Sequence, residues 1–517
     1  MINQSYDYNL GLAFYSVARD QGSRVAFYYP DGKKFTYAEV DQRSNQIARS
    51  LVSKGFRPGD VLAIFNDKSP EAYCSMLACL KIGVIYTNLD QTNPWERLKK
   101  IIATCSPRAV FYDNESFEII REIGLTFSDI DCIHYQSTTF KSELDAFGHE
   151  LLLESKDIHG GMAAYIMFTS GSTGFPKGAV MSHSNVLNFI QWGRQTFGIS
   201  GEDVFTNVNP IYFDNSVFDF YTSIFSGATL VPLDAAIVKN PKQLVQAIND
   251  AKCTIWFSVP SLLVYLLTTK ALSEGDFQSV RRIGFGGEGF PKNKLKQLYD
   301  LFGKRIALYN IYGPTECTCI CSSYLISERD FENMTELAPL GFMSPNFGYE
   351  IIPAEVGSSD YGELALTGPC VGMGYYNDAD RTAKSFVQNP LKSYDERMYK
   401  TGDIVERSEN GYLYFKGRVD NQIKHMGYRI ELEEVEAAFS SLPYINEVGV
   451  IYEKITPELG QIKAFISVAE GSKDLKDIQV DVKGILPTYM IPKIFVLEAL
   501  PKNRNGKIDR KQLATIK

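Results

Sequence analysis

An alternation of short apolar runs with longer amphipathic segments is the feature that most restricts the fold of this chain. The apolar runs have strand length, and the segments between them repeat apolar residues at helical spacing. Strands separated by helices of this length pair in parallel, so we expect an α/β fold. The expected helices are 37–54, 70–82, 94–105 and 184–197, and the expected strands are 60–65, 84–88, 109–112, 165–169, 254–258, 282–286 and 307–311.

The pattern changes twice toward the C-terminus. From about residue 339, short β segments such as 362–366 and 411–416 alternate with glycine-rich turns. After residue 419 a strand–helix–strand order begins, in a segment of ordinary size for a small domain. We expect a large N-terminal domain over residues 1–419, made of α/β sheets plus a β subdomain. A hinge is expected to join it to a small α+β domain over residues 420–517.

The charge balance excludes some classes of partner. The 517 residues carry a formal net charge of −8, whereas general nucleic-acid or membrane-surface binders show a basic face. No run approaches the ~18 apolar residues that span a bilayer, and the first residues lack the pattern of a signal peptide. We expect a cytoplasmic protein with no nucleic-acid and no membrane partner.

Three of the nine cysteines, Cys317, Cys319 and Cys321, alternate with other residues. In a strand this spacing places all three side chains on one face, whereas structural zinc sites use C-x₂-C pairs. We expect buried cysteines on a strand beside a pocket. A metal site is the alternative.

The densest chemical signal is the segment 169–178, with the sequence TSGSTGFPKG. It follows an apolar strand and precedes a helix. Glycines let backbone N–H groups close round an anion, while hydroxyls and a lysine add donors and positive charge. The spacing differs from that of a Walker A loop. The segment predicts a phosphate-binding loop, with a mobile surface loop as the alternative.

This segment resembles the phosphate-binding loop of the adenylate-forming enzymes, the superfamily of acyl-CoA synthetases, luciferases and peptide-synthetase adenylation domains. Further segments match the superfamily in order and spacing, namely 310–316 (NIYGPTE), 362–377, 399–403 (YKTGD), 417–431 and 503–509 (NRNGKID). The resemblance implies that the chain uses ATP to activate a carboxylate as an acyl-adenylate and then transfers the acyl group to a thiol.

The resemblance also implies roles for individual residues. Negative charge accumulates around the α-phosphorus during adenylation, so cations and Mg²⁺ are expected to dominate the catalytic groups. The implied catalytic residues are Lys507, Glu316, Thr315 and Arg418, with Glu316 as the Mg²⁺ ligand. The residues implied for ATP binding are Thr169, Ser170, Gly171, Ser172, Thr173, Gly174, Lys177, Asn310, Tyr312, Asp403 and Arg418.

Asp420 lies where the two expected domains meet, at the position of the superfamily's hinge. By the resemblance, one orientation of the small domain brings Lys507 to the α-phosphate and the substrate carboxylate. The other orientation brings the Gly427 segment to the active site and opens a path for a thiol. Rotation at one exposed backbone position suffices for such a swing. An ordinary interdomain linker is the alternative.

Asp214, in the segment FDNSVF, bears on the class of acid. Members that activate amino acids use an aspartate here for the α-ammonium group, and a carboxylate is a poor neighbour for a fatty chain. A helix N-cap is the alternative. The implied pocket walls are Asn215, Phe218, Phe257, Gly284, Gly286, Ile311, Cys319 and Ile320. Their apolar character predicts an amino acid with an uncharged side chain.

Within the superfamily the D-alanine–carrier protein ligases look most similar, through residues 420–434 and 486–492. They resemble one another in having a cysteine at the slot of Gly286, so the glycine predicts room for a side chain larger than that of alanine. No carrier segment follows Lys507, so we expect a phosphopantetheinylated carrier protein in trans. A ligase for D-alanine itself, an acyl-CoA ligase for a fatty or aryl acid, and a non-catalytic nucleotide binder are the alternatives.

Overall fold

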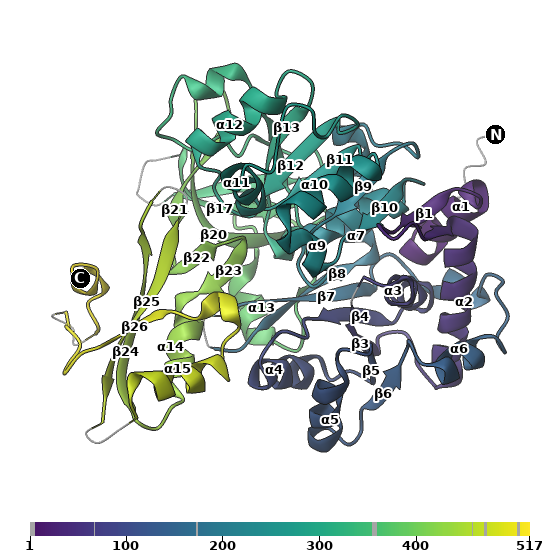
Figure 1. Cartoon of the computed structure of the whole chain (residues 1–517), viewed down its shortest axis with the longest axis horizontal. Helices are drawn as coiled ribbons and strands as arrows, with labels where there is room; N and C mark the ends of the chain where they lie inside the picture. Colours follow the sequence, from purple (N-terminus) through teal and green to yellow (C-terminus); the bar gives the residue numbers. More distant parts are fainter. Residues whose placement is uncertain are drawn as a thin grey trace.

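The computed structural model describes residues 6–66, 68–171, 174–353, 359–456, 459–469, 473–503 and 507–516. Two large sheets with flanking helices form the body of the molecule, and the C-terminal segment lies at one end, at the left of Figure 1. The α/β fold class expected from the sequence is confirmed. None of the described helices is long and apolar enough to cross a membrane.

One large sheet is built mainly from the first part of the chain. Its strands are β3 (Val61–Phe65), β4 (Ile85–Leu89), β5 (Ala109–Tyr112), β6 (Asp131–His134), β7 (Ala163–Thr169), β8 (Lys177–Ser182) and β18 (Gly374–Tyr375). Helices of this region are α1 (Leu10–Gln21), α2 (Tyr37–Ser53), α3 (Pro70–Ile82), α4 (Trp95–Cys105), α5 (Phe117–Thr126) and α6 (Thr138–Leu144). The order is β18-β8-β7-β4-β3-β5-β6, and the neighbours β4, β3, β5 and β6 are parallel, as the alternation predicts.

Local signals delimit the crossover helices. The hydroxyl of Ser69 accepts a hydrogen bond from the N–H of Ala72 and so caps α3, which ends at Gly83 with φ 69°. A side chain is disfavoured at that φ, so glycine is the residue that stops the helix there.

The predicted phosphate loop joins two antiparallel strands. The sequence pattern predicts the helix over 184–197 but no strand between it and the loop. In the structure β8 comes first, with Lys177 opposite Thr169. The helix α7 (His183–Phe197) begins only after Ser182, which forms a capping box with Asn185. The loop therefore turns a hairpin back along β7, and its ends are fixed by strand pairing.

The second large sheet spans residues 25–343. Its strands are β1 (Val25–Tyr28), β2 (Lys34–Thr36), β9 (Val204–Asn207), β10 (Thr229–Pro232), β11 (Ile255–Ser258), β12 (Arg282–Gly286), β13 (Ala307–Tyr312), β14 (Ser322–Leu325) and β15 (Phe342–Met343). Helices here are α8 (Asn215–Val217), α9 (Ala235–Lys239), α10 (Pro241–Asp250), α11 (Pro260–Thr268) and α12 (Lys292–Phe302). The order is β15-β14-β13-β12-β11-β9-β10-β1-β2, parallel from β13 to β1. Ligands bind beyond the carboxyl ends of such strands.

Smaller sheets complete the fold. The β subdomain contains β16 (Gly348–Pro353), β17 (Tyr361–Thr367), α13 (Ala379–Ser385), β19 (Phe386–Gln388), β20 (Arg397–Arg407) and β21 (Leu413–Arg418). The C-terminal segment contains β22 (Gln422–His425), β23 (Tyr428–Glu431), α14 (Leu432–Ser440), β24 (Ile445–Lys454), β25 (Gly460–Val468), α15 (Leu475–Lys483), β26 (Lys493–Val496) and α16 (Arg510–Leu513). It forms an apolar core of its own between α14, α15 and the sheet β24-β25-β26, so it can keep its shape whichever way it faces the rest.

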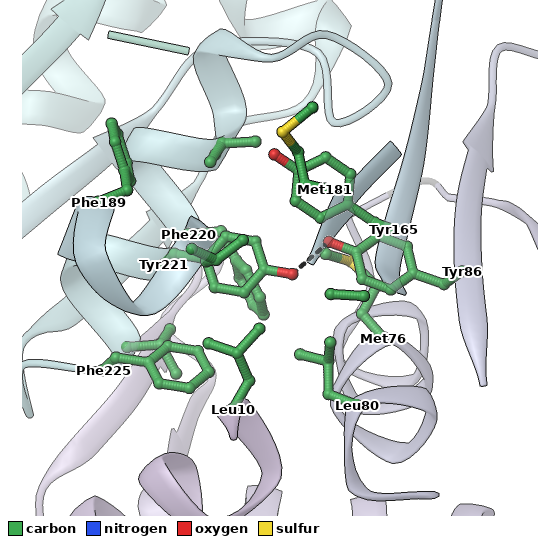
Figure 2. Close-up of a cluster of buried hydrophobic side chains, with 14 of the residues drawn as sticks. Leu10, Met76, Leu80, Tyr86, Tyr165, Met181, Phe189, Phe220, Tyr221 and Phe225 are labelled. Atoms are coloured by element: carbon green, nitrogen blue, oxygen red, sulfur yellow. Dashed lines mark hydrogen bonds between the residues drawn. The ribbon is translucent and has the colours of Figure 1, made fainter. Parts of the chain in front are cut away.

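A buried aromatic cluster supports the segment that follows Asp214. Figure 2 shows Tyr221, from the π-helix η2 (Phe218–Thr222), meeting Tyr86 of β4 hydroxyl to hydroxyl at 2.7 Å, with Tyr165 of β7 beside them. All three rings are at most 2% exposed, and burying a large apolar side chain contributes roughly 1.5–3 kcal/mol. This packing fixes η2 between the two large sheets.

The strand predicted over Cys317, Cys319 and Cys321 is wrong. Thr318 and Cys319 have φ values of 56° and 76°, which a strand cannot contain, and β14 begins only at Ser322. The three thiols are nevertheless buried. Within the described ranges, no group of three or more His, Cys, Asp or Glu side chains could hold a metal ion.

Candidate active site

A cavity lies where the carboxyl ends of the second sheet meet β7 and the hairpin β22–β23. The body of the protein contributes Thr169, Ser170, Asn209, Phe213, Asp214, Asn215, Phe257, Gly286, Ile311, Thr315, Cys319 and Ile320, among others. The C-terminal segment contributes Lys424, Met426, Gly427, Tyr428, Arg429 and Tyr489. Most residues predicted for the substrate therefore surround one space, which the C-terminal segment helps to close. Of the described residues predicted for the nucleotide, Thr169 and Ser170 line this space and the others lie outside its lining.

Asp214 presents its carboxylate to this cavity. Its Oδ2 accepts a hydrogen bond from the Thr315 hydroxyl at 2.5 Å, and it makes no capping bond to α8. Burial raises the pKa of Asp214, and the hydrogen bond from Thr315 offsets only part of that rise. A half-buried carboxylate of this kind is stabilised by a cationic partner.

The predicted pocket walls fall into two layers. Asn215, Phe257, Gly286, Ile311, Cys319 and Ile320 line the cavity. Phe218 lies behind Phe257, with ring centroids 5.3 Å apart, and a Cβ at Gly284 would lie 2.6 Å from Cδ1 of Ile311. Phe218 and Gly284 therefore shape the wall from behind.

Gly286 has a structural role besides leaving space. A Cβ at this position would overlap the backbone oxygen of Ile311 on the neighbouring strand β13. The glycine thus permits close pairing of β12 with β13, so its absence of a side chain is not by itself a measure of substrate size.

The loop offers donors suited to an anion. The Thr169 hydroxyl is buried without a partner among the described residues, and the N–H of Gly171 points at a carboxylate oxygen, Oε2 of Glu434, at 3.3 Å. A Cβ at Gly171 would overlap the backbone oxygen of Phe175, so only glycine fits. These features suit phosphate oxygens. Gly174 has φ 77°, and the predicted Ser172 and Thr173 lie outside the described residues.

The other residues implied for the nucleotide form a network at the end of β13 and β20. The Tyr312 hydroxyl donates to Oδ2 of Asp403 at 2.5 Å, and the Arg418 guanidinium bonds Oδ1 of Asp403 and both oxygens of Asp420. Asp403 thus belongs to a charged cluster that includes Asp420, the predicted hinge position. Asn310 instead donates to the backbone oxygen of Pro339 at 2.7 Å, which ties β13 to the following loop.

Glu316 is fully buried among cations. Lys177 lies 3.6 Å away, Arg429 of β23 lies 2.8 Å away, and the Tyr375 hydroxyl donates to its carboxylate at 2.8 Å. Burial alone would raise the pKa of Glu316, but Arg429 and Lys177 more than offset it and hold the pKa far below its ordinary value. Glu316 is therefore an anion here, and Arg429 takes the coordination space that a hard cation would need.

The structure does not bring Lys507 to the cavity. Its side chain is exposed and does not line the cavity, while its backbone N–H donates to Oδ1 of Asn503 at 3.1 Å. Instead, Gly427 enters the site: its N–H donates to Glu288 at 2.9 Å, and with φ 82° it packs against Val259. This is the orientation in which the Gly427 segment, rather than the lysine, faces the cavity.

Several contacts near the cavity involve residues that were not predicted. The Arg97 guanidinium forms a buried ion pair with Glu434, and the Ser170 hydroxyl donates to the backbone oxygen of Arg429 at 2.6 Å. Lys424 lines the cavity and interacts electrostatically with both Asp214 and Asp403. The basic residues of the segment 422–431 are the sequence feature from which the contacts of the hairpin β22–β23 could have been predicted. Arg97 lies in an ordinary amphipathic helix, and its sequence context does not indicate the ion pair with Glu434.

Comparisons with known proteins agree on one family. The family model of the AMP-binding enzymes matches residues 14–376, and that of the AMP-binding enzyme C-terminal domain matches residues 434–507. The chain is 32% identical to an L-proline–[L-prolyl-carrier protein] ligase of Streptomyces coelicolor, covering 95% of this chain and 93% of the relative. It is also 32% identical to the D-alanine–D-alanyl carrier protein ligase of Staphylococcus aureus, covering 93% and 94%.

A solved structure supports the fold. The o-succinylbenzoate CoA synthetase of Bacillus subtilis superposes with a TM-score of 0.83 at 22% identity, covering 98% of each chain. The likeness extends over the body and the C-terminal segment together.

Proposed function

The chain belongs to the AMP-binding enzyme family, and from this premise we propose that it uses ATP to adenylate an uncharged amino acid. In a second step it transfers the aminoacyl group to the phosphopantetheine thiol of a carrier protein in trans. ATP use follows from the family. The observation that carries the amino-acid assignment is Asp214, a carboxylate that accepts a hydrogen bond from Thr315 and lines the cavity next to the phosphate loop.

Charge complementarity supports the choice of acid. A buried carboxylate favours a ligand with a positive group nearby, and the α-ammonium of an amino acid supplies one. A fatty or aryl acid brings no positive group, so the charge of Asp214 would be balanced only by protein cations such as Lys424. Both curated relatives named above are ligases of amino acids and carrier proteins.

For the first step we assign binding of the phosphates to the 169–178 loop and Lys177. Asp403, held by Tyr312 and Arg418, is assigned to the ribose hydroxyls. Lys507 would bring positive charge to the α-phosphate and the attacking carboxylate, which requires the C-terminal segment to leave its present orientation by rotation at Asp420. The exposed position of Lys507 and the separate core of that segment are compatible with such a movement.

Mg²⁺ is part of this proposal, with Glu316 as its protein ligand. One carboxylate is a usual protein contribution, because Mg²⁺ takes its remaining ligands from phosphates and water. When bound, the ion would neutralise phosphate charge. Glu316 becomes available to it only once Arg429 withdraws, so metal binding and the present orientation exclude each other.

For the second step we assign the present orientation. The Gly427 hairpin, Tyr428 and Tyr489 line the cavity together with Asp214, which suits a thiol arriving from the side of the hairpin. A cytoplasmic location is also part of the proposal, since adenylation draws on ATP.

The test is amino-acid-dependent exchange of labelled pyrophosphate into ATP, screened over L- and D-amino acids. Exchange with at least one uncharged amino acid is expected. Silence across the whole panel, with the protein shown to be folded and to bind ATP, would refute the amino-acid assignment. CoA consumption with a fatty or aryl acid would replace it with an acyl-CoA ligase.

Replacing Lys424 with alanine separates the two steps. The ammonium interacts with Asp214 and Asp403 in the present orientation, and the rotation proposed at Asp420 would carry it away. Pyrophosphate exchange should therefore be little changed while aminoacylation of a carrier falls by roughly tenfold or more. Lys476→Ala, an exposed lysine of α15, is the matched control. Equal losses in both half-reactions would show that Lys424 does not act in transfer alone.

A further inference from the structure

Asn209 places a polar amide in the wall of the cavity. The residue is 4% exposed and lines the cavity. It follows β9 at the carboxyl edge of the second sheet, next to Pro210. A buried amide in such a place calls for an account of each of its hydrogen-bonding atoms.

The orientation of this amide is determined by its partners. Its Nδ2 donates to Oδ2 of Asp219 and to the backbone oxygen of Phe257, both at 2.9 Å. A backbone carbonyl only accepts hydrogen bonds, so the NH₂ group has to face Phe257. Both amide hydrogens are used, and the oxygen Oδ1 is turned the other way.

That oxygen is an acceptor without a partner in the described part of the chain. Oδ1 receives no hydrogen bond from another described residue. It also differs from the fully inaccessible unpaired polar atoms of the structure, because part of its surface remains accessible. Because the residue is almost wholly buried and lines the cavity, the space to which this oxygen is accessible is the cavity. An acceptor held rigidly toward a ligand space is stabilised when a ligand donor meets it.

Asn207 provides a built-in comparison. Its Nδ2 donates to the same Oδ2 of Asp219 at 3.0 Å, but its Oδ1 accepts from the Tyr73 hydroxyl at 2.6 Å. Asn207 is fully buried and does not line the cavity. The two asparagines thus donate to the same carboxylate oxygen of Asp219, and of the two only Asn209 has an amide oxygen that can accept a hydrogen bond from a ligand.

The amide lies beside the residues predicted as walls for the substrate side chain. The amide is tied to Phe257, a predicted wall residue. Burial raises the pKa of the Cys319 thiol, and the carboxyls of Asp214 and Asp219 raise it further, so this second wall residue lies near both. Asp214 meets the cation of the ligand, while the neutral amide suits an uncharged donor.

We propose that Asn209 is a specificity-determining residue whose amide oxygen accepts a hydrogen bond from a hydroxyl donor on the side chain of the amino-acid substrate. The proposal rests on the proposed function. It narrows the substrate class from amino acids with an uncharged side chain to those whose uncharged side chain also donates a hydrogen bond. Asp219 acts as the positioning residue that holds the amide.

The test compares substrates that differ only in the donor. In pyrophosphate exchange, kcat/KM is measured for threonine against valine and for serine against alanine, in both stereochemical series. The wild-type enzyme should prefer the member with the donor, because an unmet acceptor discriminates against its isostere. Asn209→Ala should lower that ratio by about tenfold, whereas Asn207→Ala should lower activity, if at all, equally for both members.

Each outcome decides the matter. A wild-type preference for valine and alanine, or none, overturns the proposal without any variant. So does an unchanged ratio in Asn209→Ala, or an equal loss for both members, which would mean that the amide serves only structure or the α-ammonium. Should the wild type show no exchange with any amino acid, the proposed function fails instead, and the two failures are distinguishable.

Discussion

Replacing Lys507 with alanine is expected to lower amino-acid-dependent pyrophosphate exchange by about 10²–10³-fold. The lysine is assigned to the charge that develops at the α-phosphate, and removing one such group typically has an effect of that size. ATP binding should persist, because the loop, Asp403 and Lys177 all lie in the body of the protein. The measurement is exchange kinetics alongside equilibrium binding of ATP.

Lys511 is the matched control for this variant. Both lysines are exposed on the same C-terminal stretch, so Lys511→Ala tests whether any loss comes merely from altered charge. The alanine at position 507 should leave the backbone bonds with Asn503 in place, since they involve no Lys507 side-chain atom. Exchange that survives in Lys507→Ala would remove this lysine from the adenylation step.

Replacing Asp214 with alanine is expected to raise the KM for the amino acid by about 10²-fold or more. The variant removes one partner of a buried charge pair and leaves the α-ammonium without its counter-ion. Thr315 also loses its 2.5 Å hydrogen-bond acceptor. The measurement is the KM for the amino acid in exchange, with the KM for ATP followed as an internal reference.

A deamino analogue of the best substrate provides the control for Asp214. The wild-type enzyme should discriminate strongly against it, whereas Asp214→Ala should treat the acid and the amino acid almost alike. An unaltered KM for the amino acid in this variant would favour an enzyme acting on fatty or aryl acids.

Much of the fold follows from local pattern. The helix over 70–82 and the strands over 109–112 and 282–286 are found at the predicted bounds, because a cap, a terminal glycine or an apolar run marks each end. The misses have local physical causes as well. The short strand β8 was not predicted. It pairs with β7 across the glycine-rich loop, and the sequence of that loop is typical of a turn that precedes a helix.

The candidate site was predictable as far as its motifs are contiguous. The order and spacing of the segments identify residues that the structure gathers round one cavity. Contacts between distant segments were not predictable, since Arg97 and Glu434 lie 337 positions apart and meet only through the packing of the C-terminal segment against α4. The same is true of Arg429 against Glu316, which depends on how two cores face each other.

Asn209 shows a different limit. An asparagine before Pro210 is typical of a turn, so the sequence alone does not indicate a site residue. Only the hydrogen bonds to Asp219 and Phe257 show which amide atom faces the cavity. A side chain's orientation within a wall is set by tertiary contacts, which spacing along the chain does not encode.

The central claim is that Lys507 leaves solvent and joins the phosphate loop at the nucleotide, and chemical labelling of lysines tests it most directly. The wild-type protein is treated with an amine-acylating reagent, and the modification rates of Lys507 and Lys511 are followed by mass spectrometry. Both should react readily without ligands, as their exposure indicates. With the amino acid and a non-hydrolysable ATP analogue bound, Lys507 should become protected while Lys511 stays reactive; equal reactivity of Lys507 in both states would contradict the account.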